Sequence, residues 1–172
     1  MLFGKLFHTG LRTADLEASV RFYTEVLGMI SVARPPLDFP GAWLAPAQAG
    51  AEATIHLYAG HAAQEADGSV QTGSGAIDHL SIVCGGYSAF RAQLERYGLP
   101  YRENLVPRTP LWQLFVYDPS GVQLELTFHS AAEREPEPVI APEKLYQPRE
   151  RWFQPAAYRQ FSNTSRADHG RP

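Results

Sequence analysis

Four side chains that can bind metal ions lie at matching positions of an internal repeat. His8 and His79 are 71 residues apart in the chain of 172. His56 and Glu125 are 69 residues apart, so each half carries one member of each couple. Equivalent positions of a repeat occupy equivalent points of a fold, so the four side chains can converge on one site. Imidazole and carboxylate ligands without thiolate suit Fe(II), Mn, Ni or Zn, and we therefore predict a divalent metal site.

Strand periodicity places two of these residues on polar faces. Glu125 lies in a predicted strand over residues 122–128, where it shares a face with Gln123 and Thr127 while the other face is apolar. His56 lies in the same way in the equivalent strand of the first half. A buried carboxylate without a partner is costly, so Glu125 needs one. A metal ion is one such partner.

The elements that must position these residues form two βαβββ modules, so the predicted fold class is α+β. The first module is predicted to begin with a strand at residues 5–11, followed by a helix that Asp15 caps and Gly28 ends. Three more strands are predicted at residues 30–34, 42–44 and 54–58. The second module is predicted to begin with a strand at residues 77–83, followed by a helix that Gly98 ends. Its other three strands are predicted at residues 101–105, 111–117 and 122–128. Residues 118–121 predict a tight turn between the last two strands.

The chain divides into a predicted domain and an irregular extension. The domain covers residues 1–130, with module one at 5–60, a linker at 61–75 and module two at 76–129. The extension covers 131–172. Six of the 14 prolines fall in residues 130–172, and the aromatic residues of this stretch show no regular helical or strand period.

Composition excludes several classes of protein. With 44% apolar residues the chain can bury a core, and its net charge of -3 gives no reason to expect nucleic acid or anionic membrane as a partner. No stretch of the sequence reaches the length of a transmembrane helix. The single cysteine, Cys84, cannot form an internal disulfide, so we expect a cytoplasmic setting and a packed thiol.

The pattern of residues 5–129 resembles the vicinal oxygen chelate superfamily. This superfamily holds glyoxalase I, extradiol dioxygenases and bleomycin-binding proteins. The stretches that carry the resemblance are residues 8–12, 22–29, 77–79 and 118–121, followed by Glu125. The resemblance implies a curved mixed sheet, or half-open barrel, around a metal site. It also implies a homodimer, because family members with two such halves often share sites between chains.

The resemblance implies roles for individual residues. His8, His79 and Glu125 match the family's two-histidine, one-carboxylate positions. His56 stands where glyoxalase I usually has a glutamate, so it is a fourth ligand, a catalytic base beside the metal, or a hydrogen-bonded histidine of the inner face. Arg12 stands where glyoxalase I has an arginine that grips a carboxylate.

A small-molecule substrate is expected in the groove beside the metal. Arg12 and Arg108 suit an anionic group on that substrate. Trp43 and Phe115 are predicted to line the pocket, although such rings also serve to fill a barrel.

Three functions remain open from the sequence. The favoured one is glyoxalase-I-like lyase or isomerase chemistry, in which Glu125 and His56 move a proton beside a metal that stabilises an enolate or oxyanion. An extradiol-type Fe(II) dioxygenase would use His8, His79 and Glu125 as a facial triad. A small-molecule binding protein without turnover is the third.

Overall fold

The computed structural model describes residues 4–162, which form two compact units. Within these residues, the first unit comprises 4–72 together with 160–162, and the second comprises 73–159. Residues 163–172, the end of the predicted C-terminal extension, lie outside the described residues. The domain boundary at residue 130 stays a prediction, and residues 131–159 belong to the second unit.

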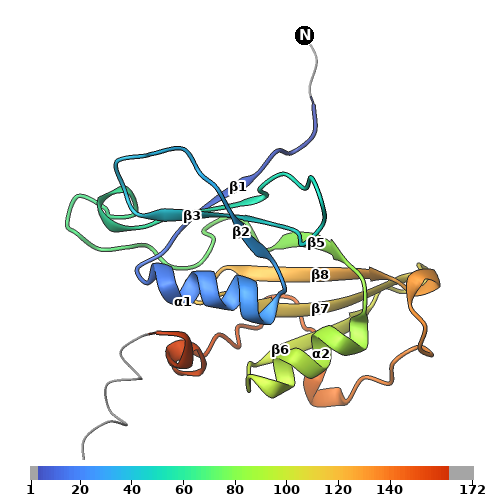
Figure 1. Cartoon of the computed structure of the whole chain (residues 1–172). Coiled ribbons are helices and arrows are strands. Elements are labelled where there is room, and N and C mark those ends of the chain that lie inside the picture. Colours follow the sequence, from blue (N-terminus) through green and yellow to red (C-terminus); the bar gives the residue numbers. More distant parts are fainter. Residues whose placement is uncertain (1–3, 163–172) are drawn as a thin grey trace, which may run out of the picture. The chain divides into compact units, whose positions relative to one another are not determined.

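The first unit is a four-strand mixed sheet with a helix along one face (Figure 1). Its elements in chain order are β1 (Thr9–Arg12), α1 (Leu16–Arg21), the π-helical turn η1 (Phe22–Val26), β2 (Ile30–Val32), β3 (Gly41–Ala45), β4 (Ile55–Tyr58) and the short 3-10 turn η2 (Gly60–Ala62). The strand order is β1-β4-β3-β2, with β1 parallel to β4 and the other pairs antiparallel.

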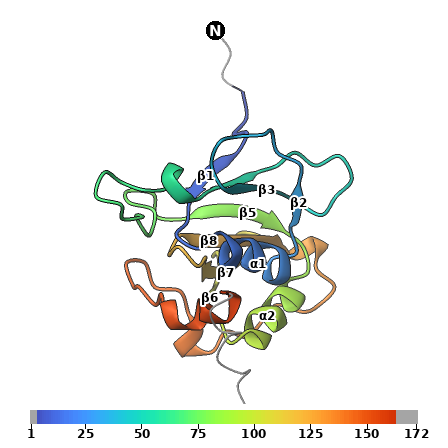
Figure 2. The ribbon, with the colours of Figure 1, turned by 60° about the vertical axis from the view of Figure 1, so that its left-hand side comes forward.

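The second unit repeats this arrangement (Figure 2). Its elements are β5 (Leu80–Cys84), α2 (Tyr87–Arg96), β6 (Tyr101–Leu105), β7 (Leu111–Tyr117) and β8 (Gln123–His129). The strand order is β5-β8-β7-β6, again with only the first pair parallel. The described residues form two four-strand mixed sheets and no closed barrel. The predicted α+β fold of two βαβββ modules is therefore confirmed.

The residues that begin and end the helices agree with the sequence prediction. The Asp15 side chain accepts a hydrogen bond of 2.9 Å from the backbone N of Ala18, as an N-cap does. Gly28 and Gly98, which follow the two helices, have φ of 70° and 60°, a left-handed conformation that glycine adopts with little strain.

The first strand is shorter than predicted. It begins at Thr9 rather than at Lys5, because its partner β4 offers ladder positions only from Ile55, which pairs with Thr9. His8 and His79 therefore stand immediately before the first residues of β1 and β5.

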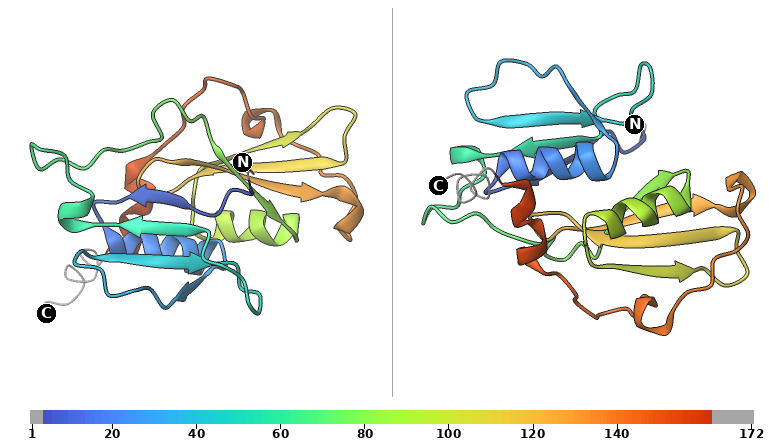
Figure 3. Two further views of the ribbon diagram at one scale, coloured as in Figure 1. Left: turned by 90° about the horizontal axis from the view of Figure 1, so that it is seen from above. Right: turned by 60° about the horizontal axis from the view of Figure 1, so that its bottom comes forward.

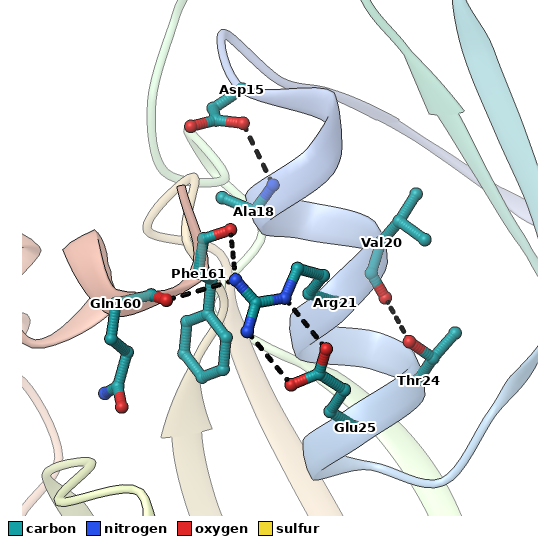
Figure 4. Close-up of polar contacts among 8 residues, drawn as sticks. All are labelled: Asp15, Ala18, Val20, Arg21, Thr24, Glu25, Gln160 and Phe161. Carbon is teal, nitrogen blue, oxygen red and sulfur yellow. Dashed lines mark hydrogen bonds and ion pairs between the residues drawn. The ribbon is translucent and has the colours of Figure 1, made fainter. Parts of the chain in front are cut away.

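The C-terminal segment runs along the second unit and returns to the first (Figure 3). It contains three short 3-10 turns, η3 (Ser130–Ala132), η4 (Pro142–Lys144) and η5 (Pro155–Phe161). In the first unit, Arg21 of α1 donates hydrogen bonds of 3.1 and 3.0 Å to the carbonyl oxygens of Gln160 and Phe161 (Figure 4). No helix in residues 4–162 is long and apolar enough to cross a membrane.

Candidate functional site

The strand registers make the two modules equivalent at the candidate site. In the first sheet, His56 lies opposite Gly10 on one side and opposite Trp43 on the other. In the second sheet, Glu125 lies opposite Ser81 and Phe115. Each module thus places one polar side chain across from one aromatic ring, and the sequence offsets correspond to a structural repeat.

In the first unit, three rings form a stack. His56 of β4 lies 4.2 Å from the Trp43 ring and 3.9 Å from the His8 ring, with interplanar angles of 8° and 15°. His56 is buried at 5% exposure. The structure therefore brings two predicted metal ligands and one predicted lining residue of this module into direct contact.

Both histidines of this stack carry features of a functional pair. Burial lowers the pKa of His56, and the charge of His8 lowers it further, so His56 favours the neutral imidazole. The Nδ1 atom of His8 is buried and has no hydrogen-bond partner. A buried nitrogen without a partner is unfavourable unless a ligand completes it.

In the second unit, the Glu125 carboxylate is held through one oxygen. The hydroxyls of Ser81 and Thr127 donate hydrogen bonds of 2.6 and 2.8 Å to Oε1. The other oxygen, Oε2, lies 3.4 Å from Nε2 of His79. The predicted need of this buried carboxylate for a partner is thus met in part by two hydroxyl groups, which leave Oε2 facing the histidine.

The His79 ring lies between two carboxylates. Its Nδ1 atom is 2.8 Å from Oδ1 of Asp78, which is exposed. A hydrogen bond to Asp78 leaves the opposite ring nitrogen facing Glu125. The Nε2 and Oε2 atoms are 3.4 Å apart, which is longer than an ordinary hydrogen bond, and both are atom types that bind metal ions.

Phe115 is covered by a residue of the C-terminal segment. Its ring lies 5.8 Å from the His79 ring, edge to face, but only 2% of the residue is exposed. Tyr146 stacks on Phe115 with a centroid separation of 3.9 Å and an angle of 10°. Tyr146 itself is half-buried.

The two predicted anion-binding arginines lie at the surface. Arg12, at the end of β1, pairs with Glu65, and both side chains are substantially exposed. Such an exposed pair contributes little stability. Arg108 lies exposed in the loop between β6 and β7 with φ of 63°.

Cys84 lies at the end of β5 and is half-buried. Burial raises the pKa of its thiol to about 11, so the thiol stays protonated near neutral pH. This agrees with a packed thiol rather than a nucleophile.

Sequence reasoning missed four residues of the site. Ser81, Asp78 and Tyr146 received no role, and Thr127 was placed on the right face without its contact to Glu125. Strand periodicity could have predicted the position of Thr127 beside Glu125. The position of Ser81 beside Glu125 depends on the β5–β8 register, which the sequence does not show. Nothing in the sequence pattern of the extension marked Tyr146.

Each unit contributes a pair of candidate ligands rather than a full set. In neither unit do three or more His, Cys, Asp or Glu side chains among residues 4–162 gather to hold a metal ion. The pairs are His8 with His56, and His79 with Glu125.

The fold and the candidate ligands together define the class of this protein. It has two βαβββ modules, and each module has a histidine before its first strand and a polar residue on its last strand. The chain belongs to the Glyoxalase/Bleomycin resistance protein/Dioxygenase superfamily, whose family model matches residues 5–126. Members of this superfamily are generally metal-dependent, bind small molecules and often form dimers, and some are not catalytic.

Known relatives and solved structures match about three quarters of the chain. Glyoxylase I 4 of Arabidopsis thaliana is 30% identical over 124 residues, which cover 70% of this chain and 68% of that protein. A protein from the mobile metagenome of V. Pseudocholerae is similar in structure, with 26% identity, a TM-score of 0.57, and 76% and 98% of the two chains covered. Lactoylglutathione lyase from Agrobacterium tumefaciens shares the fold, with 19% identity, a TM-score of 0.53, and 74% and 95% covered.

Proposed function

We propose that this protein is a divalent-metal-dependent enzyme with glyoxalase-I-like lyase or isomerase chemistry. Its substrate is a small molecule with two adjacent oxygens. The observation that carries this proposal is the pair of equivalent half-sites, His8 with His56 and His79 with Glu125, at matching registers of the two sheets.

The side chains present are suited to a metal ion. The buried Nδ1 of His8 lacks a partner, and Nε2 of His79 and Oε2 of Glu125 are 3.4 Å apart, so that one ion could bind both atoms. We propose that His8, His79 and Glu125 hold the ion, with His56 as a fourth ligand or as a base. This requires the two pairs to meet, within one chain or across a homodimer. When bound, the ion supplies Lewis acidity that stabilises negative charge on a substrate oxygen.

Glu125 and His56 are proposed to move the proton. Two hydroxyls hold Oε1 of Glu125 in place, so Oε2 is the oxygen free to accept a proton from the substrate. The lowered pKa of His56 keeps its ring neutral near pH 7, as a proton acceptor must be. Arg12 and Arg108 are proposed to contact an anionic group of the substrate.

Metal content of the full-length protein tests the site. We expect protein purified without oxygen and loaded with Zn, Ni, Mn or Fe(II) to hold stoichiometric metal by elemental analysis. His79→Asn and Glu125→Gln should each lower metal affinity at least about tenfold. His129→Asn is the matched control, because His129 is exposed at the end of the strand that carries Glu125. Equal metal content in all four proteins would contradict the assignment.

Two assays distinguish the reaction. Isomerisation of thiol adducts of 2-oxoaldehydes to thioesters, followed by absorbance, is the expected activity. Oxygen uptake with catechols and bound Fe(II) would instead select ring-cleaving dioxygenase chemistry. Tight binding of a small molecule without metal or turnover would indicate a binding protein.

A further inference from the structure

The face of the first sheet that carries His56 also carries a tyrosine. Tyr58 follows His56 by two residues on β4, so the two side chains share a face and their Cα atoms are about 7 Å apart along the strand. The ladder partner of Tyr58 on the neighbouring strand β1 is Arg12. Tyr58 therefore lies beside both a proposed reacting group and a proposed anion-binding arginine.

The absence of a side chain at Gly10 lets the Tyr58 ring lean toward His56. Gly10 is the ladder partner of His56, and a Cβ atom added to Gly10 would lie 2.9 Å from the Cε2 atom of Tyr58. This separation is well below the 3.5–4.0 Å at which carbon atoms make contact. The ring thus extends over Gly10, into the row of the sheet that holds His56.

One face of the Tyr58 ring is supported by Phe39. The two rings stack with a centroid separation of 5.3 Å and an interplanar angle of 23°. The Arg34 guanidinium holds Phe39 in place, because it donates hydrogen bonds of 3.1 and 3.0 Å to the Phe39 carbonyl oxygen and lies 5.1 Å from the centre of the Phe39 ring. Within residues 4–162 the ring of Tyr58 stacks on no other aromatic side chain, and Tyr58 is half-buried. Its second face is left without an aromatic partner.

In the second unit, the protein's own chain covers the equivalent face. Trp43 and Phe115 hold equivalent positions, because they lie opposite His56 and Glu125 in their sheets. Phe115 is 2% exposed beneath Tyr146, whereas Trp43 is only half-buried. Of the two equivalent faces, the one in the first unit therefore keeps exposed aromatic surface.

We infer that Tyr58 forms a substrate subsite beside His56 that selects a planar apolar group, such as an aryl ring. The group packs against the face of Tyr58 opposite Phe39, and contacts between aromatic rings favour it over an aliphatic group. Phe39 and Gly10 position the Tyr58 ring without touching the substrate. The inference rests on the proposed function, and it specifies the substrate class as molecules whose two adjacent oxygens carry a planar substituent.

Two hydroxamates that differ only in their substituent test the subsite on the Co(II)-loaded full-length protein. Benzohydroxamate carries a phenyl ring and acetohydroxamate a methyl group, and both have a carbonyl and a hydroxyl oxygen on adjacent atoms. Visible absorption of Co(II) reports the binding of each probe. We expect wild type to bind benzohydroxamate at least about tenfold more tightly, because its ring packs on Tyr58 and leaves water.

Removing or displacing the Tyr58 ring should reduce this preference. We expect Tyr58→Leu, which loses the ring, and Gly10→Ala, which moves it, each to lower the preference for benzohydroxamate about threefold to tenfold while Co(II) affinity stays within about twofold of wild type. The conservative variant Tyr58→Phe, which retains the ring, should recover the preference. Gly85→Ala is the matched control for Gly10→Ala, because a Cβ atom at Gly85 meets no other atom within 4 Å. Its preference should equal that of wild type.

The outcomes separate the two proposals. If wild type binds Co(II) but neither probe, or binds both probes equally, the subsite is wrong and the metal site stands. The same holds if Tyr58→Leu and Gly10→Ala keep the full preference. If Tyr58→Leu weakens both probes by the same factor, the role of Tyr58 is structural and the subsite is again wrong. If wild type binds no metal, the proposed function and the subsite fail together.

Discussion

Equivalent positions of the two modules hold side chains in opposite surroundings. His56 is packed between two rings, and its burial favours the neutral imidazole. Glu125 accepts hydrogen bonds from the hydroxyls of Ser81 and Thr127 through one of its oxygens. The same register position thus gives an imidazole and a carboxylate different surroundings, because the neighbours of each position differ.

Cys84 gives a pH-dependent prediction at the residue scale. Its raised thiol pKa of about 11, against 9.0 for an exposed thiol, means that far less thiolate is present in the folded protein at pH 8. We expect native protein to react with a disulfide reagent such as DTNB at least about tenfold more slowly than unfolded protein at this pH. The native rate should rise as the pH approaches 11. Equal rates for native and guanidinium-unfolded protein would show that the thiol is neither buried nor perturbed.

The two helices begin in different ways. Asp15 caps α1 from within its own module. Before α2 stands Gly86, with φ of 86° and no side chain to cap the helix, and the carboxylate of Glu133 takes that place from the C-terminal segment. A carboxylate at this position satisfies two backbone N–H groups and opposes the positive end of the helix dipole.

Removing the Glu133 charge tests this contact at the element scale. We expect Glu133→Gln to lower the free energy of unfolding by about 1 kcal/mol, because the cap becomes neutral and loses an acceptor. Urea unfolding monitored by circular dichroism measures the change. Glu137→Gln, the same substitution at an exposed position of the segment, should leave the unfolding midpoint unchanged. An equal effect of both variants would mean that only net charge matters.

At the scale of the whole molecule, the C-terminal segment links the two units covalently for a second time. Residues 131–159 belong to the second unit, and residues from 160 onward belong to the first. In the first unit, the Arg21 guanidinium binds two carbonyl oxygens of the segment and the carboxylate of Glu25 at the same time (Figure 4). Ser162 adds a hydrogen bond of 2.5 Å to Asp15.

Replacing the guanidinium tests how firmly the segment is attached. Arg21→Lys keeps the charge but cannot reproduce the planar set of donors, so we expect a loss of about 1 kcal/mol. Amide hydrogen exchange in residues 155–162 should become faster while exchange in β7 and β8 stays the same. Arg96→Lys, at the exposed last turn of α2, is the control. Unchanged exchange in residues 155–162 would show that Arg21 does not anchor the segment.

The sequence by itself predicted most of the elements, their repeat and the four candidate ligands. Helical and strand periodicity are local properties, and Gly28 and Gly98 mark helix ends because few other residues adopt a positive φ. The equivalence of His56 and Glu125 needed only the spacing between repeats.

Only the tertiary structure decided the surroundings of these residues. Ser81 reaches Glu125 through the β5–β8 register, and Tyr146 reaches Phe115 by a path of the C-terminal segment that has no periodic signal. Such contacts join residues far apart in sequence, and they depend on how the backbone packs rather than on local pattern. For that reason the sequence predicts Phe115 as a ring that lines the pocket, whereas in the structure Phe115 is buried and Tyr146 stacks on it.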